Sequence, residues 1–446
     1  MDIDTDIVIL GAGLSGLAAA EALSAAGERV LLLEKEHFSG GLARTVAYKN
    51  FKFDLGGHRL YFKDASLAGR VEKLLAPEPL LRFKRRSSTF IGGRFLRYPP
   101  TLLNGLLYAV PALFKRLRRT ASKPPEGSLK DWLHARFGPG IHDAYFKDYT
   151  LKVWGLPTDS ISAVWAEKRI GPLNLKKLFF EVLSAKSASK ENALDFLYPA
   201  CGIGGLCSSL QNKLPPGALL TGAVPLEFET GRGKINSVIF EQDGIRRRLS
   251  CRHVVSTIPL TGLAPLFRSD PGLAASGRGI KYRSLIVLFA AMKRKAPLKD
   301  HWIYFPEKEI FFSRACELSN WSPSMAGTGG ASPITFEIFC DEGDETWRMK
   351  DENLLKETER SLRAIKLFGD FETSEFTAVR LPHAYPLLYS GFEGPLGGLK
   401  TALAGYRNLE LCGRTGVHDY LDMEECLQNA EAAAARILAK KKAAEQ

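Results

Sequence analysis

Residues 6–16 read DIVILGAGLSG, and the segment that follows is rich in alanine and leucine as far as Ala26. The apolar run predicts a buried parallel strand. The alanine- and leucine-rich run predicts a helix that ends at Gly27. A second apolar run, at residues 29–33, predicts another buried strand and leads into Glu34. This order of strand, glycine-rich turn, helix, strand and acid is typical of a dinucleotide-binding βαβ unit.

Each glycine of the turn has a physical role in that interpretation. Gly11 permits the tight turn, Gly13 lets the backbone approach a pyrophosphate, and Gly16 lets the helix pack close to the strand. The positive end of the helix dipole then faces the phosphates. Glu34 lies where an acid can accept hydrogen bonds from ribose hydroxyls. A plain βαβ unit is the alternative, since glycine-rich turns are common. The predicted nucleotide contacts in this stretch are Gly11, Gly13, Leu14, Ser15, Gly16, Glu34 and Lys35.

Composition bounds the class of protein. The chain has 446 residues, of which 45% are hydrophobic and 25% charged, which excludes a disordered or fibrous chain and allows two or three domains. Seven cysteines without short paired spacings argue against a disulfide scaffold or a zinc module, and no metal site is predicted. The acidic start lacks the basic region of a signal peptide, and no stretch approaches the roughly 20 apolar residues of a membrane-spanning helix. We therefore expect a cytoplasmic protein.

The positive charge is concentrated in one block. Residues 79–125 contain eleven basic residues and no acidic one, which is almost the whole net charge of +12. Such a block predicts an anionic partner rather than general nucleic-acid binding. The apolar run at 102–114 followed by KRLRR at 115–119 is typical of a helix lying in an anionic membrane surface, at the inner face of the membrane. A packed capping helix with a solvated end, or cations that attract a diphosphate substrate, are the alternatives.

Two segments after Glu34 narrow the cofactor. They are SGGLART at residues 39–45 and FDLGGHR at residues 53–59. Both resemble segments of the FAD-binding flavoproteins that include amine oxidases, protoporphyrinogen oxidases, phytoene desaturases and UDP-galactopyranose mutases. The resemblance implies FAD as the cofactor. It implies that the paired glycines and Arg44 contact its diphosphate, and that the Gly-Gly-His segment approaches the flavin ring. The residues implied are Gly41, Leu42, Ala43, Arg44, Gly56, Gly57 and His58.

Later motifs resemble the UDP-galactopyranose mutases most closely. The matching segments are YFKDYTLKVWG (145–155), FLYP (196–199), GIGGL (202–206), HVVSTIP (253–259), FSR (312–314) and CGRTGVHDYLDM (412–423). The resemblance implies catalytic roles for His58, Arg314 and Arg414, with Arg314 on a substrate diphosphate. It implies substrate contacts by Tyr385, His418 and Tyr420. The further cofactor contacts it implies are Val224, Gly413, Arg414, Tyr420, Leu421 and Asp422, although Asp422 also suits the N-cap of the last helix.

Some positions depart from the mutase pattern. Leu173 stands where the mutases carry a mobile-loop arginine, and His418 replaces a diphosphate-binding tyrosine. The segments GGHR (56–59) and NWSP (320–323) are closer to proteins of the protoporphyrinogen-oxidase type.

Three functions follow from these motifs. The first is a flavoenzyme that acts through reduced FAD on a small-molecule substrate, an anionic sugar diphosphate that is nucleotide-linked or a lipid-linked (polyprenyl) sugar. The second is an FAD-dependent oxidoreductase that abstracts hydride from a hydrophobic or sugar substrate. The third, a non-catalytic lipid carrier like the GDP-dissociation inhibitors, is disfavoured by the intact glycine, acid and Gly-Arg motifs. The Tyr-Leu-Asp-Met ending and Arg314 favour sugar chemistry.

The distribution of the motifs predicts a discontinuous α/β fold. We expect a Rossmann-type, glutathione-reductase-like FAD-binding domain from residues 1–65, 195–260 and 375–446. Residues 66–194 are predicted to form a helical cap that carries the basic block. Residues 261–374 are predicted to form a mixed-sheet substrate domain.

Overall fold

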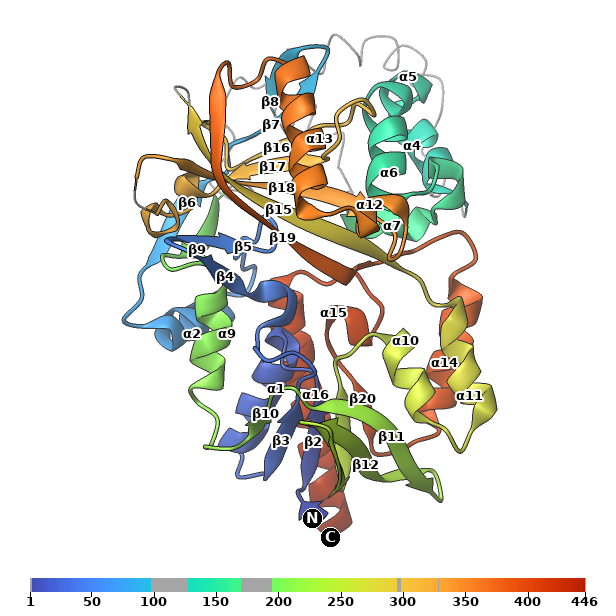
Figure 1. Cartoon of the computed structure of the whole chain (residues 1–446). Coiled ribbons are helices and arrows are strands. Elements are labelled where there is room, and N and C mark those ends of the chain that lie inside the picture. The colour runs from blue at the N-terminus through green and yellow to red at the C-terminus, as the bar shows by residue number, and fades with distance from the viewer. Residues whose placement is uncertain (1, 98–126, 170–194, 295–297, 328, 446) are drawn as a thin grey trace.

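A computed structural model describes residues 2–97, 127–169, 195–294, 298–327 and 329–445 (Figure 1). A parallel sheet with its helices forms one end of the molecule, where both termini lie, and a larger sheet forms the other end. The Rossmann-type prediction is confirmed.

The parallel sheet forms from the short apolar runs that the sequence shows. All four residues of β2 are buried, because helices or a second sheet cover both faces. Its strands, in spatial order, are β10 (Leu219–Leu220), β3 (Val30–Leu33), β2 (Ile7–Leu10), β14 (His253–Ser256) and β20 (Leu409–Leu411). The strands that carry the first, middle and last motifs are thus neighbours, which makes the domain discontinuous.

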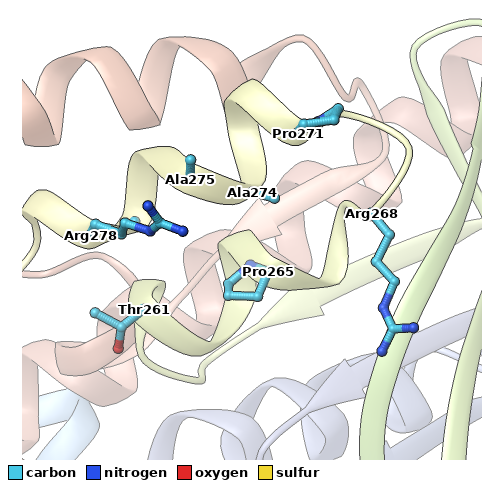
Figure 2. Close-up of a pocket in the computed structure, with 8 residues that line it drawn as sticks. Thr261, Pro265, Arg268, Pro271, Ala274, Ala275 and Arg278 are labelled. Carbon is cyan, nitrogen blue, oxygen red and sulfur yellow. The ribbon is translucent and has the colours of Figure 1, made fainter.

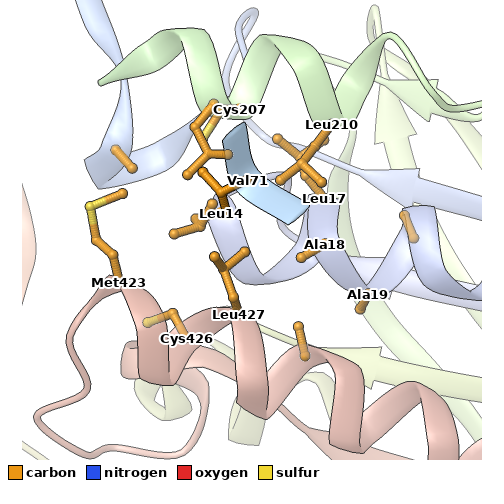
Figure 3. Packing of buried hydrophobic residues seen from close by; sticks show 14 of the residues in the cluster. Leu14, Leu17, Ala18, Ala19, Val71, Cys207, Leu210, Met423, Cys426 and Leu427 are labelled. Carbon is orange, nitrogen blue, oxygen red and sulfur yellow. The ribbon is translucent and has the colours of Figure 1, made fainter. Parts of the chain in front are cut away.

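Two helices from opposite ends of the chain cover one face of this sheet. They are α1 (Leu14–Ala25) and α16 (Met423–Glu445). Figure 3 shows Leu14 and Leu17 of α1 facing Leu427 of α16, with α9 (Gly204–Gln211) beside them. The other face packs against a second sheet. Its strands, in spatial order, are β1 (Asp2–Asp4), β13 (Ile245–Ser250), β12 (Lys234–Gln242) and β11 (Val224–Gly231).

A seven-stranded sheet forms the other end of the molecule. Its strands, in spatial order, are β19 (Phe371–Pro386), β15 (Tyr282–Arg294), β18 (Ser332–Cys340), β17 (Arg314–Glu317), β16 (Trp302–Tyr304), β7 (Ser87–Ile91) and β8 (Arg94–Arg97). Helix α13 (Asp351–Ala364) packs on this sheet, and the hairpin of β4 (Thr45–Tyr48) and β5 (Phe51–Asp54) also contacts it. Phe53 of the hairpin stacks on Phe289 with ring centroids 4.9 Å apart.

The cap helices lie beside the seven-stranded sheet (Figure 1). The cap consists of α4 (Leu129–Phe137), α5 (Pro139–Ile141), η2 (His142–Phe146), α6 (Lys147–Trp154), η3 (Thr158–Ser160) and α7 (Ala163–Arg169). Ser128 and Asp131 form a capping box that starts α4. The remaining elements are η1 (Gly41–Ala43), α2 (Ala65–Leu75), β6 (Leu80–Lys84), β9 (Asp195–Pro199), α10 (Leu260–Leu263), η4 (Ala264–Leu266), α11 (Pro271–Ser276), η5 (Gly277–Gly279), η6 (Leu318–Asn320), η7 (Pro323–Met325), α12 (Glu345–Arg348), α14 (Glu393–Ala404) and α15 (Gly413–Gly416).

The observed elements differ from the predicted domain bounds in two places. The region assigned to a helical cap, 66–194, contains the strands β6, β7 and β8, and the last two extend the seven-stranded sheet. The predicted boundary at residue 375 falls inside β19, which pairs with β15 along its length. The reason is the same in both cases, since strand pairing with a distant segment is invisible in the local pattern.

Several sequence features lie outside the described residues. They include residues 98–125 of the basic block and Leu173, so contact of residues 79–125 with an anionic membrane stays a prediction. Within the described ranges, no helix is long and apolar enough to cross a bilayer. The same ranges hold no cluster of three His, Cys, Asp or Glu side chains suited to a metal ion. All seven cysteines are free thiols.

Candidate active site

The glycines of residues 11–16 and of residues 40–41 pack closely together at the start of α1, and we call this arrangement the glycine cradle. A Cβ atom on Gly16 would lie 2.0 Å from the carbonyl oxygen of Gly11, and one on Gly41 would lie 3.1 Å from the Cα of Gly13. Gly13 is the N-cap of α1 and brings no side chain to that helix end. Gly13 and Gly40 also form a parallel β-bridge. The N–H groups of the first turn of α1, which lack partners within the helix, and the helix dipole fit the diphosphate of FAD.

The acid and the cation beside this cradle also fit a dinucleotide. Glu34 directly follows β3, and its Oε2 accepts a hydrogen bond of 2.8 Å from the backbone N–H of Ala12. The Arg44 guanidinium lies 3.7 Å over the ring of Phe38. Burial lowers the pKa of Arg44, and Glu36 and Glu34 oppose that effect. Its buried Nε has no hydrogen-bond partner within the described part of the chain, so it is available to an anion.

Two further predicted nucleotide contacts, Val224 and Lys35, lie close to Glu34. Val224 begins β11 and is 42% exposed, next to Ala223, whose N–H donates to the carbonyl oxygen of Glu34. An exposed valine beside Glu34 suits an adenine ring. Lys35 is exposed and its Nζ lies 3.7 Å from Oε1 of Glu36, and its nucleotide contact stays a prediction.

A buried aspartate fixes the segment that leads to the Gly-Gly-His motif. Asp54 accepts hydrogen bonds of 2.6 Å from the hydroxyls of Thr45 and Tyr198, and its Oδ1 and Oδ2 lie 3.3 and 3.4 Å from the N–H of Ile203. Asp54 is 2% exposed. Burial raises the pKa of Asp54 to about 6, although the three donors oppose that effect. This carboxyl therefore ties the hairpin to the start of α9.

The raised pKa of Asp54 predicts a pH dependence of stability. The folded state holds the Asp54 proton up to about pH 6, whereas the unfolded chain loses it near 3.8. The stabilisation is therefore fully present below pH 3.8 and is lost as the pH rises through about 6. Relative to Asp54→Asn, we expect the free energy of unfolding of the wild type to fall by about 2–3 kcal/mol across this window. Urea unfolding of both proteins measures the difference.

The matched control is Asp370→Asn, which removes an exposed carboxyl. Its unfolding free energy should follow that of the wild type across the same window. A difference between wild type and Asp54→Asn that does not change with pH would contradict the buried, protonated carboxyl.

The Gly-Gly-His segment (56–58) contacts the strands β17 and β18 of the seven-stranded sheet. The N–H of Gly57 points at Oε1 of Glu337, 3.4 Å away, and Gly57 itself is exposed. A Cβ on Gly57 would lie 3.6 Å from both Cys316 and Trp321. His58 donates from Nδ1 to the carbonyl oxygen of Gly56, 3.2 Å away. Burial first, and Arg414 second, lower the pKa of His58 to about 4, so its ring is neutral at pH 7.

Arg314 is held by two partners opposite this segment. Its Nη1 donates to Oε2 of Glu337 at 2.9 Å, and its Nε donates to the hydroxyl of Tyr149 at 3.0 Å. Burial alone would lower the pKa of Arg314, but Glu337 and Tyr149 outweigh it and the pKa is raised. Glu337 was not predicted from the sequence. Its only signal is that it is a single acid inside the apolar strand ITFEIF (334–339).

A buried lysine anchors the helix that supplies Tyr149. Lys152 of α6 donates from Nζ to the carbonyl oxygens of Phe305, Glu307 and Phe312, at 2.9, 3.0 and 2.6 Å. Burial lowers the pKa of Lys152 to about 7. These bonds fix the cap helix to the loop before β17, and so they position Tyr149 against Arg314.

An aromatic cluster surrounds the second predicted arginine. Tyr385 and Tyr420 are stacked with centroids 5.5 Å apart, and Trp154 meets both rings edge-on. The Arg414 guanidinium lies 5.3 Å from the Tyr420 ring and donates from Nε to the carbonyl oxygen of Leu421. Burial raises the pKa of Tyr385 to about 12, so this phenol stays protonated. The structure thus brings His58, Arg314, Arg414, Tyr385 and Tyr420 into one site.

Two predicted contacts also have structural roles. The Asp422 carboxylate accepts a hydrogen bond from the N–H of Glu425, and the N–H of Asp422 donates to the Glu425 carboxylate, so this pair caps α16. His418 is 3% exposed, and its ring packs edge-on against Tyr282 with centroids 4.8 Å apart. Burial lowers the pKa of His418 to about 4. Its buried Nδ1 has no hydrogen-bond partner within the described part of the chain, and its role as a substrate contact stays a prediction.

A shallow cavity lies elsewhere, beside α10 and α11 (Figure 2). Thr261, Pro265 and Arg278 are among the residues that line it. None of its lining residues belongs to the predicted site. The predicted site therefore lies outside this cavity.

Solved structures of low sequence identity share the fold. The structure of reduced UDP-galactopyranose mutase matches 98% of this chain and 94% of that chain, with a TM-score of 0.84 and 22% identity. Wild-type putrescine oxidase bound to putrescine matches 98% of this chain and 100% of that chain, with a TM-score of 0.65 and 16% identity. These likenesses establish the fold alone.

Curated relatives match only a short segment. The human all-trans-retinol 13,14-reductase is 40% identical over 65 residues, which are 15% of this chain and 11% of that protein. The first relatives share about a tenth of their length with this chain.

A family model covers nearly the whole chain. The model of flavin containing amine oxidoreductases matches residues 14–438, from the first helix to the last. The glycine cradle, Glu34 and Arg44 fit the FAD of that family. The chain therefore belongs to the flavin containing amine oxidoreductases and is an FAD-dependent enzyme.

Proposed function

We propose that this flavoenzyme acts on an anionic sugar diphosphate, nucleotide- or polyprenyl-linked, with reduced FAD and no net redox change. The observation that carries the proposal is Arg314, a guanidinium fixed by Glu337 and Tyr149 opposite the Gly-Gly-His segment. A preorganised guanidinium binds a phosphate oxyanion with charge-assisted hydrogen bonds. The fold shared with reduced UDP-galactopyranose mutase supports the proposal.

The residues of the site have separable tasks in this reaction. Arg314 holds the diphosphate as bound substrate and as leaving group. Tyr385, Tyr420 and Trp154 pack against the substrate and exclude water. His58 stays neutral beside Arg414, so it orients groups by hydrogen bonding rather than by charge. When bound, FAD supplies the electron pair or the hydride acceptor, which no side chain of the site can supply.

A second candidate is an oxidoreductase that removes hydride from a hydrophobic or sugar substrate. The stacked Tyr385 and Tyr420 with the edge of Trp154 favour it, because such an aromatic surface also binds an apolar substrate. The retinol reductases that match a short segment, and putrescine oxidase, support the same candidate.

One experiment separates the two candidates. Purified holoenzyme is incubated without oxygen, either oxidised or reduced with dithionite, with UDP-galactose or a polyprenyl diphosphate sugar. The proposal predicts that only the reduced enzyme converts the sugar diphosphate to an isomer, with no change in flavin absorbance after turnover. Bleaching of the oxidised flavin by a substrate, with peroxide formed when air is admitted, would instead establish the oxidoreductase.

A further inference from the structure

The seven-stranded sheet extends the site away from the aromatic cluster. Tyr304 of β16 is paired in register with Arg314 of β17, so both side chains stand on the same face of the sheet. The Arg314 guanidinium lies 5.9 Å from the Tyr304 ring. Tyr149 meets Tyr304 edge-on, with centroids 6.0 Å apart. Tyr304 is therefore a neighbour of Arg314 on the side opposite Tyr385.

A second guanidinium reaches Tyr304 from the other direction. Arg85, two residues before β7, donates from Nη2 to the hydroxyl of Tyr304 at 3.4 Å. Its Nε donates to the hydroxyl of Ser87 at 2.9 Å. The Arg85 guanidinium also lies 4.9 Å from the ring of Trp302, whose indole N–H donates to the Tyr304 hydroxyl. The planar group is thus held in place by an aromatic face and two hydroxyls.

The contacts of Arg314 orient the rest of its guanidinium. Its Nη1 donates to the carboxylate of Glu337, whose side chain is 2% exposed, and its Nε donates to the hydroxyl of Tyr149. The Arg314 side chain is 21% exposed. Nη2 makes no hydrogen bond within the described ranges. This leaves donor capacity for a ligand.

We propose that Arg85, Tyr304 and Arg314 form an anion clamp that binds an oxyanion of the substrate, a phosphate or a carboxylate, on the β16 side of Arg314. Arg85 at the hydroxyl of Tyr304 and Arg314 beside its ring supply the charge and the directed donors that such a group needs. Arg85 is then a specificity-determining residue. The proposal deepens the proposed function, because a diphosphate held by Arg314 would have its second phosphate at Arg85.

Calorimetric titration of the holoenzyme tests the clamp without turnover. Inorganic pyrophosphate and succinate are titrated at one fixed ionic strength, because screening weakens both. The wild type should bind at least one of them. Arg85→Met should weaken that binding at least about tenfold, and Arg85→Lys should recover part of it. The matched control, Arg82→Met, removes an exposed cation three residues away and should change Kd less than about twofold.

The probe that binds more tightly shows whether the clamp prefers a phosphate or a carboxylate. Tighter binding of either one supports the clamp. Binding by Arg85→Met within twofold of wild type would overturn it, as would a wild type that binds neither probe. An unchanged flavin spectrum and thermal midpoint of Arg85→Lys guard against misfolding. The outcome is independent of the proposed function: an enzyme that isomerises no sugar diphosphate can still bind pyrophosphate through Arg85.

Discussion

Replacement of Arg314 with methionine should destabilise the protein by about 3–5 kcal/mol and abolish turnover. The stability loss follows from Glu337, whose side chain is 2% exposed and would be left buried without its cation. Tyr149 would also lose the donor that its hydroxyl accepts from. Urea unfolding measures the first effect, and the assay of the reduced holoenzyme measures the second.

A second substitution separates the two effects. Arg314→Met combined with Glu337→Gln removes the stranded charge, so most of the stability should return while turnover stays absent. The matched control is Arg360→Met, which breaks the exposed pair with Glu357 and should change stability by less than about 0.5 kcal/mol. If Arg314→Met alone were as stable as wild type, the buried pair would not be what positions Arg314.

Substitution of Gly16 with alanine should give a protein that retains little FAD. The new Cβ would lie 2.0 Å from the backbone carbonyl oxygen of Gly11, and a backbone atom cannot move aside as a flexible side chain can. The turn must open to accommodate it, and such overpacking costs typically about 1–3 kcal/mol. The FAD affinity should fall by about ten- to a hundredfold. Flavin absorbance of the purified variant, with and without added FAD, measures the loss.

Gly69 provides the matched control for this substitution. It lies inside α2, and a Cβ there meets no atom within 4 Å. Gly69→Ala should bind FAD as the wild type does and gain slightly in stability, because alanine favours the helix. Undiminished FAD binding by Gly16→Ala would show that the opening turn is not the diphosphate cradle.

The FAD-binding unit could be predicted because its determinants are local. Residues 6–34 contain the two strands, the turn, the helix and the acid in one stretch. The pattern of apolar residues predicts the strands and the helix, and the spacing of the glycines predicts the turn. Asp422 was recognised as a helix-cap candidate for the same reason, since its partner Glu425 is three residues away.

The substrate side could be predicted only in part, because it depends on pairings between distant segments. Arg85 reaches Tyr304 only because β7 pairs with β16, more than two hundred residues further along the chain. Glu337 becomes a partner of Arg314 through the register of β17 with β18. The contact of His418 with Tyr282 could not be predicted, because a motif position does not reveal which distant ring packs beside it.

FAD binds this chain with its diphosphate on the turn at residues 11–16, and every proposal above depends on that binding. Titration of the purified wild-type protein with FAD, followed by visible absorbance and by the phosphorus NMR signals of the bound diphosphate, tests it most directly. We expect one FAD per chain, with both phosphorus signals displaced from those of free FAD. A protein that stays colourless and leaves added FAD unbound would contradict it.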